Sequence, residues 1–241
     1  LAEFMGTFLF VFLGLSVNVA LKTNPASAAF APVLGALGWG LSLALGISVA
    51  ASSSGGHVNP AVTLALVAQR RFPCIQALGY IVFQVLGAFA AALVVHLIQI
   101  QTISAYADHK YTVIGDRSTA DLFACYPSAE TSNWTAFFVE LVGTAVLVIS
   151  ILNNCRETTT NAGKAWLPFA AGFTLVVLAV SFGAQTGGAF NPARDYGPRL
   201  YTFVSRWGWQ VFSAYHFYSW IPVVAPVLGA QVGTLLFDIF L

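Results

Sequence analysis

Ser54-Gly-Gly-His-Val-Asn-Pro-Ala-Val62 and Thr186-Gly-Gly-Ala-Phe-Asn-Pro-Ala-Arg194 are two copies of one motif, and this motif decides the fold. Each copy is a glycine-rich segment followed by Asn-Pro and a mostly apolar run. Proline is tolerated in the first turn of a helix, so each run predicts a short helix that begins at Asn-Pro. A helix N-terminus presents unpaired N–H groups and a partial positive charge. Two such ends in one chain indicate a site.

The composition is that of a membrane protein. Of the 241 residues, 58% are hydrophobic and only 8% are charged, whereas a soluble domain has about 25% charged residues. A net charge of +1 offers no basic surface for nucleic acid. The spacing of Cys74, Cys125 and Cys155 fits neither a zinc site nor a disulfide framework. We therefore expect ordinary apolar packing for the cysteines, and no metal or cofactor.

The apolar segments predict helices of two lengths. A helix that spans a membrane needs about 20 apolar residues. Non-helical backbone at membrane depth, here about 51–58 and 184–190, is tolerated only when it is buried in protein or lines a wet cavity, so a water-filled path is expected. Two shorter runs, about 59–69 and 191–203, begin at the Asn-Pro motifs and are typical of re-entrant half-helices. Six stretches are long enough to span: about 1–21, 31–51, 74–100, 134–152, 165–183 and 219–241.

The sequence similarity between the two halves extends beyond the motif. Glu3-Phe-Met-Gly-Thr7 resembles Glu140-Leu-Val-Gly-Thr144. Three spanning helices per half force the second half to insert upside down relative to the first. We therefore predict an all-α membrane protein with six transmembrane helices and two re-entrant half-helices in an inverted repeat. The single domain, 1–241, then consists of repeat one at about 1–100, a linking loop at about 101–133 and repeat two at about 134–241.

Basic residues predict the orientation in the membrane. The positive-inside rule places the side that carries Arg70, Arg71, Arg156 and Lys164 in the cytoplasm, together with both termini. The opposite side receives the linking loop. Its sequon, Asn133-Trp-Thr, is a candidate glycosylation site, although it adjoins a predicted helix.

Asn59 and Asn191 have two interpretations. Asparagine is a good N-cap residue, and a third Asn-Pro-Ala at Asn24 lacks both glycine neighbours and a matching partner, so the tripeptide alone is weak evidence. Within the repeat we interpret both residues as pore residues, because their amide groups can donate to a passing oxygen while the helix dipoles repel cations and protons. The two pore motifs are Asn59-Pro60-Ala61 and Asn191-Pro192-Ala193.

The glycines before each motif allow the backbone to turn its carbonyl groups into the path as a row of acceptors. Ordinary turns would use the same glycines, so that alternative stays open. The predicted carbonyl positions are Gly55, Gly56, His57, Val58, Gly187, Ala189 and Phe190.

Glu3 and Glu140 are carboxylates inside predicted spanning helices, where a charge costs several kcal/mol. A proton relay is one interpretation. The other is a scaffold in which each carboxylate accepts hydrogen bonds from the N–H groups of the re-entrant loop in its own half. Their matched positions in the two repeats favour the scaffold.

Together these motifs resemble the aquaporin, or major intrinsic protein, family over essentially the whole chain. Asp195 after Asn-Pro-Ala-Arg, Pro198-Arg199, and Ala-Cys-Tyr-Pro at 124–127 resemble its glycerol-conducting branch. The resemblance implies a homotetramer in a lipid bilayer, expected to be the plasma membrane. It also implies a passive channel for water and small neutral solutes such as glycerol and urea, closed to ions and protons.

The resemblance further implies a selectivity filter made of Trp39, Ala179, Gly188 and Arg194. Arg194 lies in the first turn of a re-entrant helix, which favours a pore role over an interfacial one. Trp39 opposite Arg194 would form a slot that is apolar on one side and hydrogen-bonding on the other, although interior aromatic residues usually only pack. The glycerol branch often carries a large aromatic residue where this chain has Gly188. With the small Ala179, this departure predicts a wide constriction.

His57 lies beside the cytoplasmic approach to the pore in this family, and a structural role is favoured. Imidazole titrates near neutrality, so we keep the hypothesis that acid pH changes permeability through His57.

Two other functions compete. A water-selective channel would share every motif, and a coupled transporter typically needs intramembrane ionisable groups, of which the chain offers few beyond Glu3, Glu140 and Arg194. An enzyme is not expected, because His-Glu-x-x-His, Gly-x-Ser-x-Gly and paired aspartates within the spans are missing from the sequence.

Overall fold

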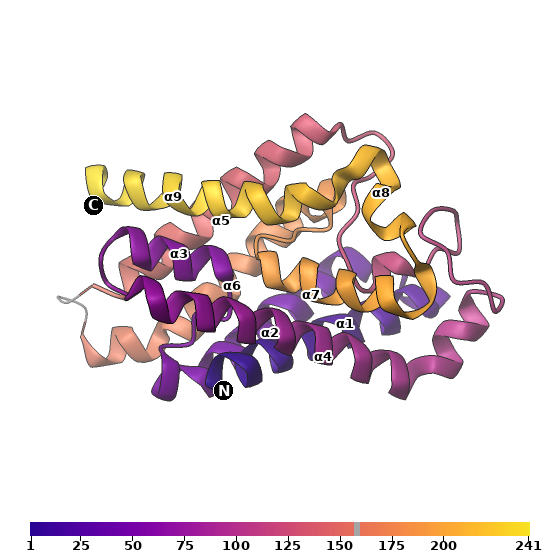
Figure 1. Ribbon diagram of the computed structural model, residues 1–241, viewed down its shortest axis with the longest axis horizontal. Helices are drawn as coiled ribbons and strands as arrows, with labels where there is room; N and C mark the ends of the chain where they lie inside the picture. The colour runs from indigo at the N-terminus through magenta and orange to yellow at the C-terminus, as the bar shows by residue number, and fades with distance from the viewer. Residues whose placement is uncertain (157–159) are drawn as a thin grey trace.

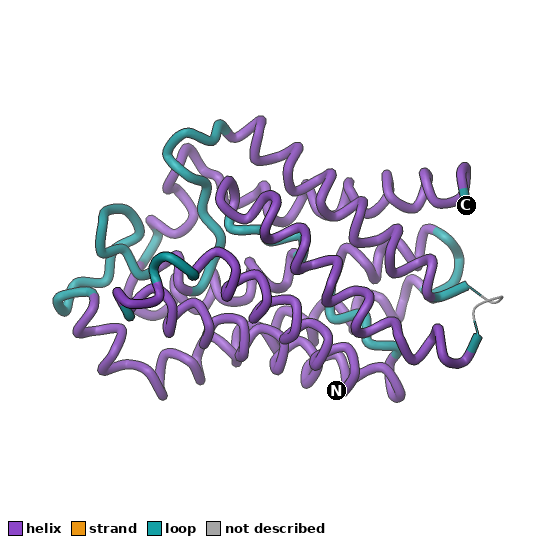
Figure 2. Tube along the Cα trace, turned by 180° about the vertical axis from the view of Figure 1, so that it is seen from behind, coloured by secondary structure: helices purple, strands orange, loops and turns teal. Residues whose placement is uncertain are grey.

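The computed structural model describes residues 1–156 and 160–241. Long helices run roughly along the longest axis, and loops gather at the two ends (Figures 1 and 2). Within these described residues, six helical segments are long and apolar enough to cross a membrane, which agrees with the predicted number. They are α1 (Ala2–Thr23), α2 (Ala31–Ser54), α4 (Cys74–Tyr106), α5 (Asn133–Asn154), α6 (Asn161–Thr186) and the segment Gln210–Phe240, which contains α8 (Gln210–Phe217) and α9 (Ile221–Phe240).

The half-helices α3 (Pro60–Ala68) and α7 (Pro192–Thr202) begin directly after the two asparagines, as predicted. The spanning helices α2, α4 and α6 continue beyond the ends predicted for them. Polar residues such as Ser54 and Thr186 fall outside an apolar stretch but still continue the helix. The non-helical backbone before each motif is therefore shorter than predicted, and the linking segment is 107–132.

The sixth predicted span, about 219–241, corresponds to α9, which begins at Ile221, whereas the short helix α8 before it was not predicted. A π-helix, η3 (Phe203–Trp207), leads into α8, and a short 3₁₀ turn, η4 (Tyr218–Trp220), separates α8 from α9. The three residues 215–217 have left-handed φ angles of 53°, 57° and 60°. Asn133 holds this corner, because its side-chain nitrogen donates to the carbonyl oxygens of Tyr215 at 3.4 Å and His216 at 3.1 Å. The sequence lacks a glycine or proline there that would have signalled the corner.

The two halves pack in matching ways. α1 packs against α2 and α4, α5 packs against α6 and α9, and α2 meets α6 between the halves. Each half-helix also reaches across to the other half, since α3 packs on α9 and α7 packs on α4. In Figure 1, α3 lies toward the left end and α7 toward the right, so the two half-helices approach the centre from opposite ends.

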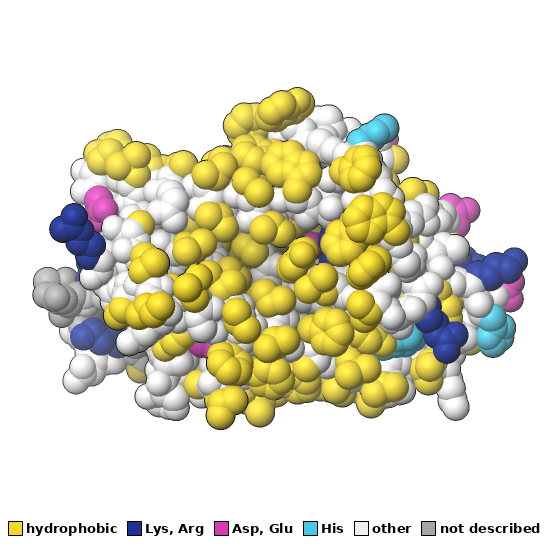
Figure 3. All heavy atoms as spheres, in the orientation of Figure 1, with side chains coloured by type: hydrophobic (Ala, Val, Ile, Leu, Met, Phe, Trp, Pro, Cys, Tyr) yellow, Lys and Arg dark blue, Asp and Glu magenta, His cyan; other side chains and the backbone are white. Residues whose placement is uncertain are grey.

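The surface divides into a band and two ends. Hydrophobic side chains cover the middle of the face in Figure 3, and charged side chains gather toward the left and right ends. An apolar band of this kind matches the hydrocarbon core of a bilayer. With the six apolar helices, it identifies an integral, multi-pass membrane protein.

Candidate functional site

The side-chain oxygens of both motif asparagines cap the half-helices. Asn59 Oδ1 accepts a hydrogen bond from Ala61 N at 2.8 Å, and Asn191 Oδ1 accepts from Ala193 N at 3.0 Å. The third motif makes a similar cap, but only on the short 3₁₀ turn η1 (Pro25–Ser27), where Asn24 accepts from the next but one N–H at 3.1 Å. The capping interpretation thus describes the oxygen atoms and leaves the NH₂ groups to be explained.

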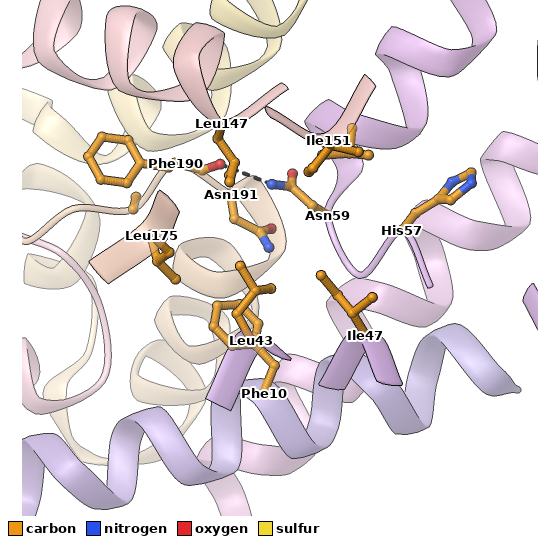
Figure 4. A pocket seen from close by; sticks show the side chains of 12 residues that line it. Phe10, Leu43, Ile47, His57, Asn59, Leu147, Ile151, Leu175, Phe190 and Asn191 are labelled. Atoms are coloured by element: carbon orange, nitrogen blue, oxygen red, sulfur yellow. Dashed lines mark hydrogen bonds between the residues drawn. The ribbon is translucent and has the colours of Figure 1, made fainter. Parts of the chain in front are cut away.

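The NH₂ groups of Asn59 and Asn191 cross between the two halves. Asn59 Nδ2 donates to Phe190 O at 3.0 Å, shown dashed in Figure 4, and Asn191 Nδ2 donates to Val58 O at 2.8 Å. Each bond fixes the amide plane and uses one of its two N–H groups. Within the described residues, the other N–H of each asparagine has no hydrogen bond and could donate to a solute. Val58 O and Phe190 O, two of the predicted pore carbonyls, each use part of their acceptor capacity on these bonds.

A narrow cavity of about 20 Å³ lies against the two asparagines and His57. Room of this size fits about one water molecule. The remaining wall is apolar and comes from both halves (Figure 4). Its side chains include Phe10, Leu43 and Ile47 from the first half and Leu147, Ile151 and Leu175 from the second.

Glu3 is buried and bonds to the first re-entrant loop. Its Oε1 accepts from Ser54 Oγ at 2.6 Å and His57 N at 3.0 Å, and its Oε2 accepts from Val58 N at 2.7 Å. Gln84 Nε2 on α4 adds a fourth donor at 2.7 Å. Four donors around one carboxylate form a rigid anchor for the loop.

Glu140 makes the matching set of contacts with the second loop. It accepts from Thr186 Oγ1 at 2.7 Å, Ala189 N at 3.0 Å and Phe190 N at 2.7 Å. Both carboxylates therefore contact their own loops, which is the geometry expected of the scaffold interpretation.

Three of the four expected filter residues, Trp39, Ala179 and Arg194, line one wide cavity of about 730 Å³. The guanidinium carbon of Arg194 lies 4.0 Å from the Trp39 ring centroid. Arg194 is only 4% exposed, and its Nη1 has no hydrogen-bond partner within the described residues. A buried donor without a partner is costly, so a solute or water oxygen in this cavity would satisfy it.

Gly188 does not line this cavity, whereas its neighbour Gly187 does. Gly188 has a left-handed φ of 61°, and a Cβ placed there would lie 3.2 Å from the Phe190 ring and 3.8 Å from the Cα of Gly183. A side chain at this position would therefore start out beside Phe190.

A buried ion pair on α7 was not predicted. Arg199 Nε donates to Asp195 Oδ1 at 2.8 Å, and Arg199 Nη2 donates to Cys125 O at 2.6 Å. Asp195 Oδ2 in turn accepts from Cys125 N at 2.7 Å. The pair thus ties the linking segment onto α7. Asp195 and Arg199 are four residues apart on one helix, and this spacing in the sequence could have indicated the pair.

The cysteines differ from one another. All three are free thiols, but only Cys125 is buried, whereas Cys74 is exposed and Cys155 is partly buried. The apolar packing expected of all three cysteines therefore fits the buried Cys125 but not the exposed Cys74. Burial raises the pKa of the Cys125 thiol to about 12. In the part of the chain that the structure describes, no group of three His, Cys, Asp or Glu side chains could hold a metal ion.

His57 sits in an aromatic cage at one end of the narrow cavity. Its ring centroid lies 4.8 Å from that of Phe72 and 5.0 Å from that of Tyr80. Its Nδ1 is 3.1 Å from Thr63 Oγ1.

Comparison with known proteins gives consistent matches. The family model described as Major intrinsic protein matches residues 1–237. A protein named aquaglyceroporin-2 from Rhizophagus irregularis is 44% identical over 238 residues, covering 98% of this chain and 75% of that protein. Aquaporin-9 from Homo sapiens is 36% identical over 238 residues, covering 98% of this chain and 80% of that protein.

A solved structure agrees with these matches. The X-ray structure of the aquaglyceroporin from Plasmodium falciparum has a TM-score of 0.88 and 30% sequence identity to this chain, covering 98% of this chain and 93% of that one. Given these matches and the paired half-helices with their crossed asparagine bonds, the chain belongs to the major intrinsic protein family.

Proposed function

We propose that this protein is a passive transmembrane channel for water and small neutral solutes such as glycerol and urea, and that it excludes ions and protons. The observation that carries the proposal is the unpartnered Nη1 of Arg194, facing a wide cavity with the Trp39 ring beside the same guanidinium. The aquaglyceroporins among its relatives support glycerol as a solute.

In this proposal Trp39, Ala179, Gly188 and Arg194 form the selectivity filter. A polyol has a hydroxyl edge and a carbon edge. Arg194 donates to the hydroxyl oxygens, and the Trp39 ring contacts the carbon atoms. Gly188 does not line the wide cavity itself, and its proposed contribution is to leave the space beside Phe190 without a further side chain. A solute in the filter thus replaces its contacts with water by contacts with the protein, and no covalent bond forms or breaks.

Farther along the path, the solute meets the free N–H groups of Asn59 and Asn191. The loop carbonyls at 55–58, 187, 189 and 190 accept its hydrogen bonds, and Glu3 and Glu140 hold both loops rigid. The positive ends of α3 and α7, with Arg194, repel cations. A water that accepts from both asparagines points its own protons away from them, which interrupts proton transfer along the path.

Each chain forms a complete path, because the two repeats supply one motif each. Membership of the family supports a homotetramer in the plasma membrane. The clusters of Arg70 and Arg71 and of Arg156 and Lys164 support a cytoplasmic position of the termini. The linking segment 107–132 then covers the extracellular end of the path.

Stopped-flow light scattering on proteoliposomes tests the proposal. We expect water, glycerol and urea to pass faster than in empty liposomes, and no current of Na⁺ or K⁺ and no proton flux above background. Water flow without glycerol flow would instead identify a water-selective channel. Solute accumulation driven by a proton gradient would identify a coupled transporter.

A further inference from the structure

One α1 side chain, Asn18, makes two hydrogen bonds at the edge of the wide cavity. Its Oδ1 accepts from the indole Nε1 of Trp39 at 2.9 Å, and its Nδ2 donates to the carbonyl oxygen of Leu122 at 3.1 Å. Nε1–H is the only hydrogen-bond donor of a tryptophan side chain. Because Asn18 occupies it, the Trp39 ring offers no donor to a solute in the cavity.

The same helix provides the space for the ring. Gly14 lies four residues before Asn18, which places both on one face of α1. A Cβ at Gly14 would lie 2.4 Å from a Trp39 ring carbon, so the indole rests directly on the helix backbone. One further turn back, Phe10 meets the indole edge-on, with ring centroids 5.4 Å apart. α1 therefore contacts the ring in three successive turns, and only Asn18 provides a directional bond.

Arg194 lies over the same ring. Its guanidinium carbon is 4.0 Å from the ring centroid, which is within the range of a cation–π contact. The orientation of the indole plane therefore sets both the cation–π contact and the direction of the apolar wall. The Asn18 bond is the polar contact that holds this plane.

We propose that Asn18 is a positioning residue for the filter, which fixes the Trp39 indole so that it presents an apolar face opposite Arg194. The inference rests on the proposed role of Trp39 in the filter. Without an acceptor at position 18, the buried N–H must find another partner, and the water or solute in the wide cavity is the nearest. The ring would then turn its polar edge toward the path, and the carbon edge of glycerol would lose its contact.

The main variants are Asn18→Leu, which has a similar length but no acceptor, and Asn18→Asp, which keeps the acceptor and loses the donor to Leu122. The readout is the ratio of glycerol to water permeability in proteoliposomes, with oligomer size and helix content checked for every variant. One net hydrogen bond corresponds to about a two- to tenfold effect. We expect Asn18→Leu to lower the ratio by this factor and Asn18→Asp to retain it.

A double-mutant cycle with Trp39→Phe tests whether the effect of Asn18→Leu on the permeability ratio acts through Trp39. Phenylalanine has no N–H, so Asn18→Leu should cause no further change in that background. Asn24→Ala is the matched control, because Asn24 lines the same cavity but bonds to Ala26 rather than to Trp39. This control should leave the ratio unchanged.

Three results would overturn the proposal. The first is an unchanged permeability ratio in Asn18→Leu, and the second is an effect of Asn18→Leu that is equal in the wild-type and Trp39→Phe backgrounds. The third is a loss in Asn18→Asp equal to that in Asn18→Leu, which would assign the effect to the Leu122 contact. The role of Trp39 is judged separately. If Trp39→Phe changes the ratio but Asn18→Leu does not, the filter stands and only the role of Asn18 fails. If Trp39→Phe leaves the ratio unchanged, the filter role of Trp39 fails and the role of Asn18 fails with it.

Discussion

Asp195 and Arg199 face each other one turn apart on α7, joined by two hydrogen bonds of 2.8 and 2.9 Å between carboxylate and guanidinium. Both side chains are buried. Arg199 also donates to Val211 O at 2.6 Å and to Cys125 O, so one guanidinium joins the half-helix to the linking segment and to α8. Arg194, which we propose as a filter residue, lies on the same short helix.

Asp195→Asn should destabilise the protein strongly. The substitution leaves the Arg199 charge buried without its counter-ion, and breaking a buried pair in this way costs about 3–5 kcal/mol. Thermal unfolding in detergent should show a large drop in the midpoint. The control is Asp121→Asn, which breaks the more exposed pair between Lys22 and Asp121. Partly exposed pairs contribute about 0–1 kcal/mol, so equal losses in the two variants would contradict a large contribution from the buried pair.

Cys125 should resist alkylation at mildly alkaline pH. The thiolate is the reactive form, and burial raises the pKa of this thiol to about 12, so the neutral thiol predominates until the pH approaches that value. With iodoacetamide at about pH 8, mass spectrometry should find the exposed Cys74 modified first. The Asp195→Asn variant should expose Cys125 to the reagent by loosening the linking segment. Equal modification of Cys74 and Cys125 in the native protein would contradict the burial.

Ala179→Phe should narrow the filter without straining the backbone. Ala179 lies on α6 and lines the wide cavity with Arg194. We expect glycerol permeability to fall at least about tenfold, or about 1.4 kcal/mol in barrier height, and water permeability to fall much less. Val177→Phe places the same aromatic ring on the exposed face of α6 and should change neither. A parallel fall for water and glycerol would contradict a size filter at this position.

Gly188→Phe is a less informative variant, although the sequence suggests it first. Any side chain at residue 188 must adopt a left-handed backbone conformation, at a cost of about 1–2 kcal/mol. It would also begin beside the Phe190 ring. A loss of transport in this variant would therefore combine loop strain with narrowing.

The elements of the pore that could be predicted are those with a local signal. Asn-Pro marks a helix start wherever it follows a flexible loop, and Glu3 and Glu140 stand out because a carboxylate in an apolar helix requires nearby donors. The caps, the half-helices and the loop anchors each have a signal within one short stretch of sequence. The bounds of the two half-helices were predicted to within a few residues.

The contacts that could not be predicted join distant parts of the chain. Arg199 meets Cys125 O across 74 positions, and Asn18 meets Leu122 O across 104. Both depend on how the linking segment folds back over the wide cavity, and that segment has no periodicity from which to predict its path. Gly188 shows a different limit. Its position in the chain could be matched to a filter position of the family. The direction in which a side chain would point from residue 188 depends on a backbone conformation that only the structure gives.

The hydrogen bonds around Thr63 determine which nitrogen of His57 carries the proton. Thr63 Oγ1 donates to Asn59 O at 3.0 Å and accepts from Gln84 Nε2 at 3.1 Å. Its single hydroxyl proton is therefore already used, so the contact of 3.1 Å with His57 Nδ1 requires the imidazole to donate. Nε2 is then the acceptor of the neutral ring. Protonation turns it into a donor and places a charge beside the narrow cavity.

Acidification through the range in which the His57 imidazole titrates should therefore change glycerol permeability. The imidazolium is attracted to the Glu3 carboxylate, whose Oε1 already bonds to the His57 backbone N–H. A ring drawn toward Glu3 leaves the narrow cavity, so we expect flux to rise at acid pH. Because burial lowers the pKa of His57 despite the nearby Glu3 carboxylate, the rise should come below the usual histidine range, as the pH falls from about 6.5 to about 4.5. Stopped-flow measurements across this range should lose the response in His57→Ala and keep it in His109→Ala, whose histidine is an exposed residue of the linking segment. A pH profile that is the same with and without His57 would assign any acid response to another group, since protonation at position 57 would then have no effect on the path.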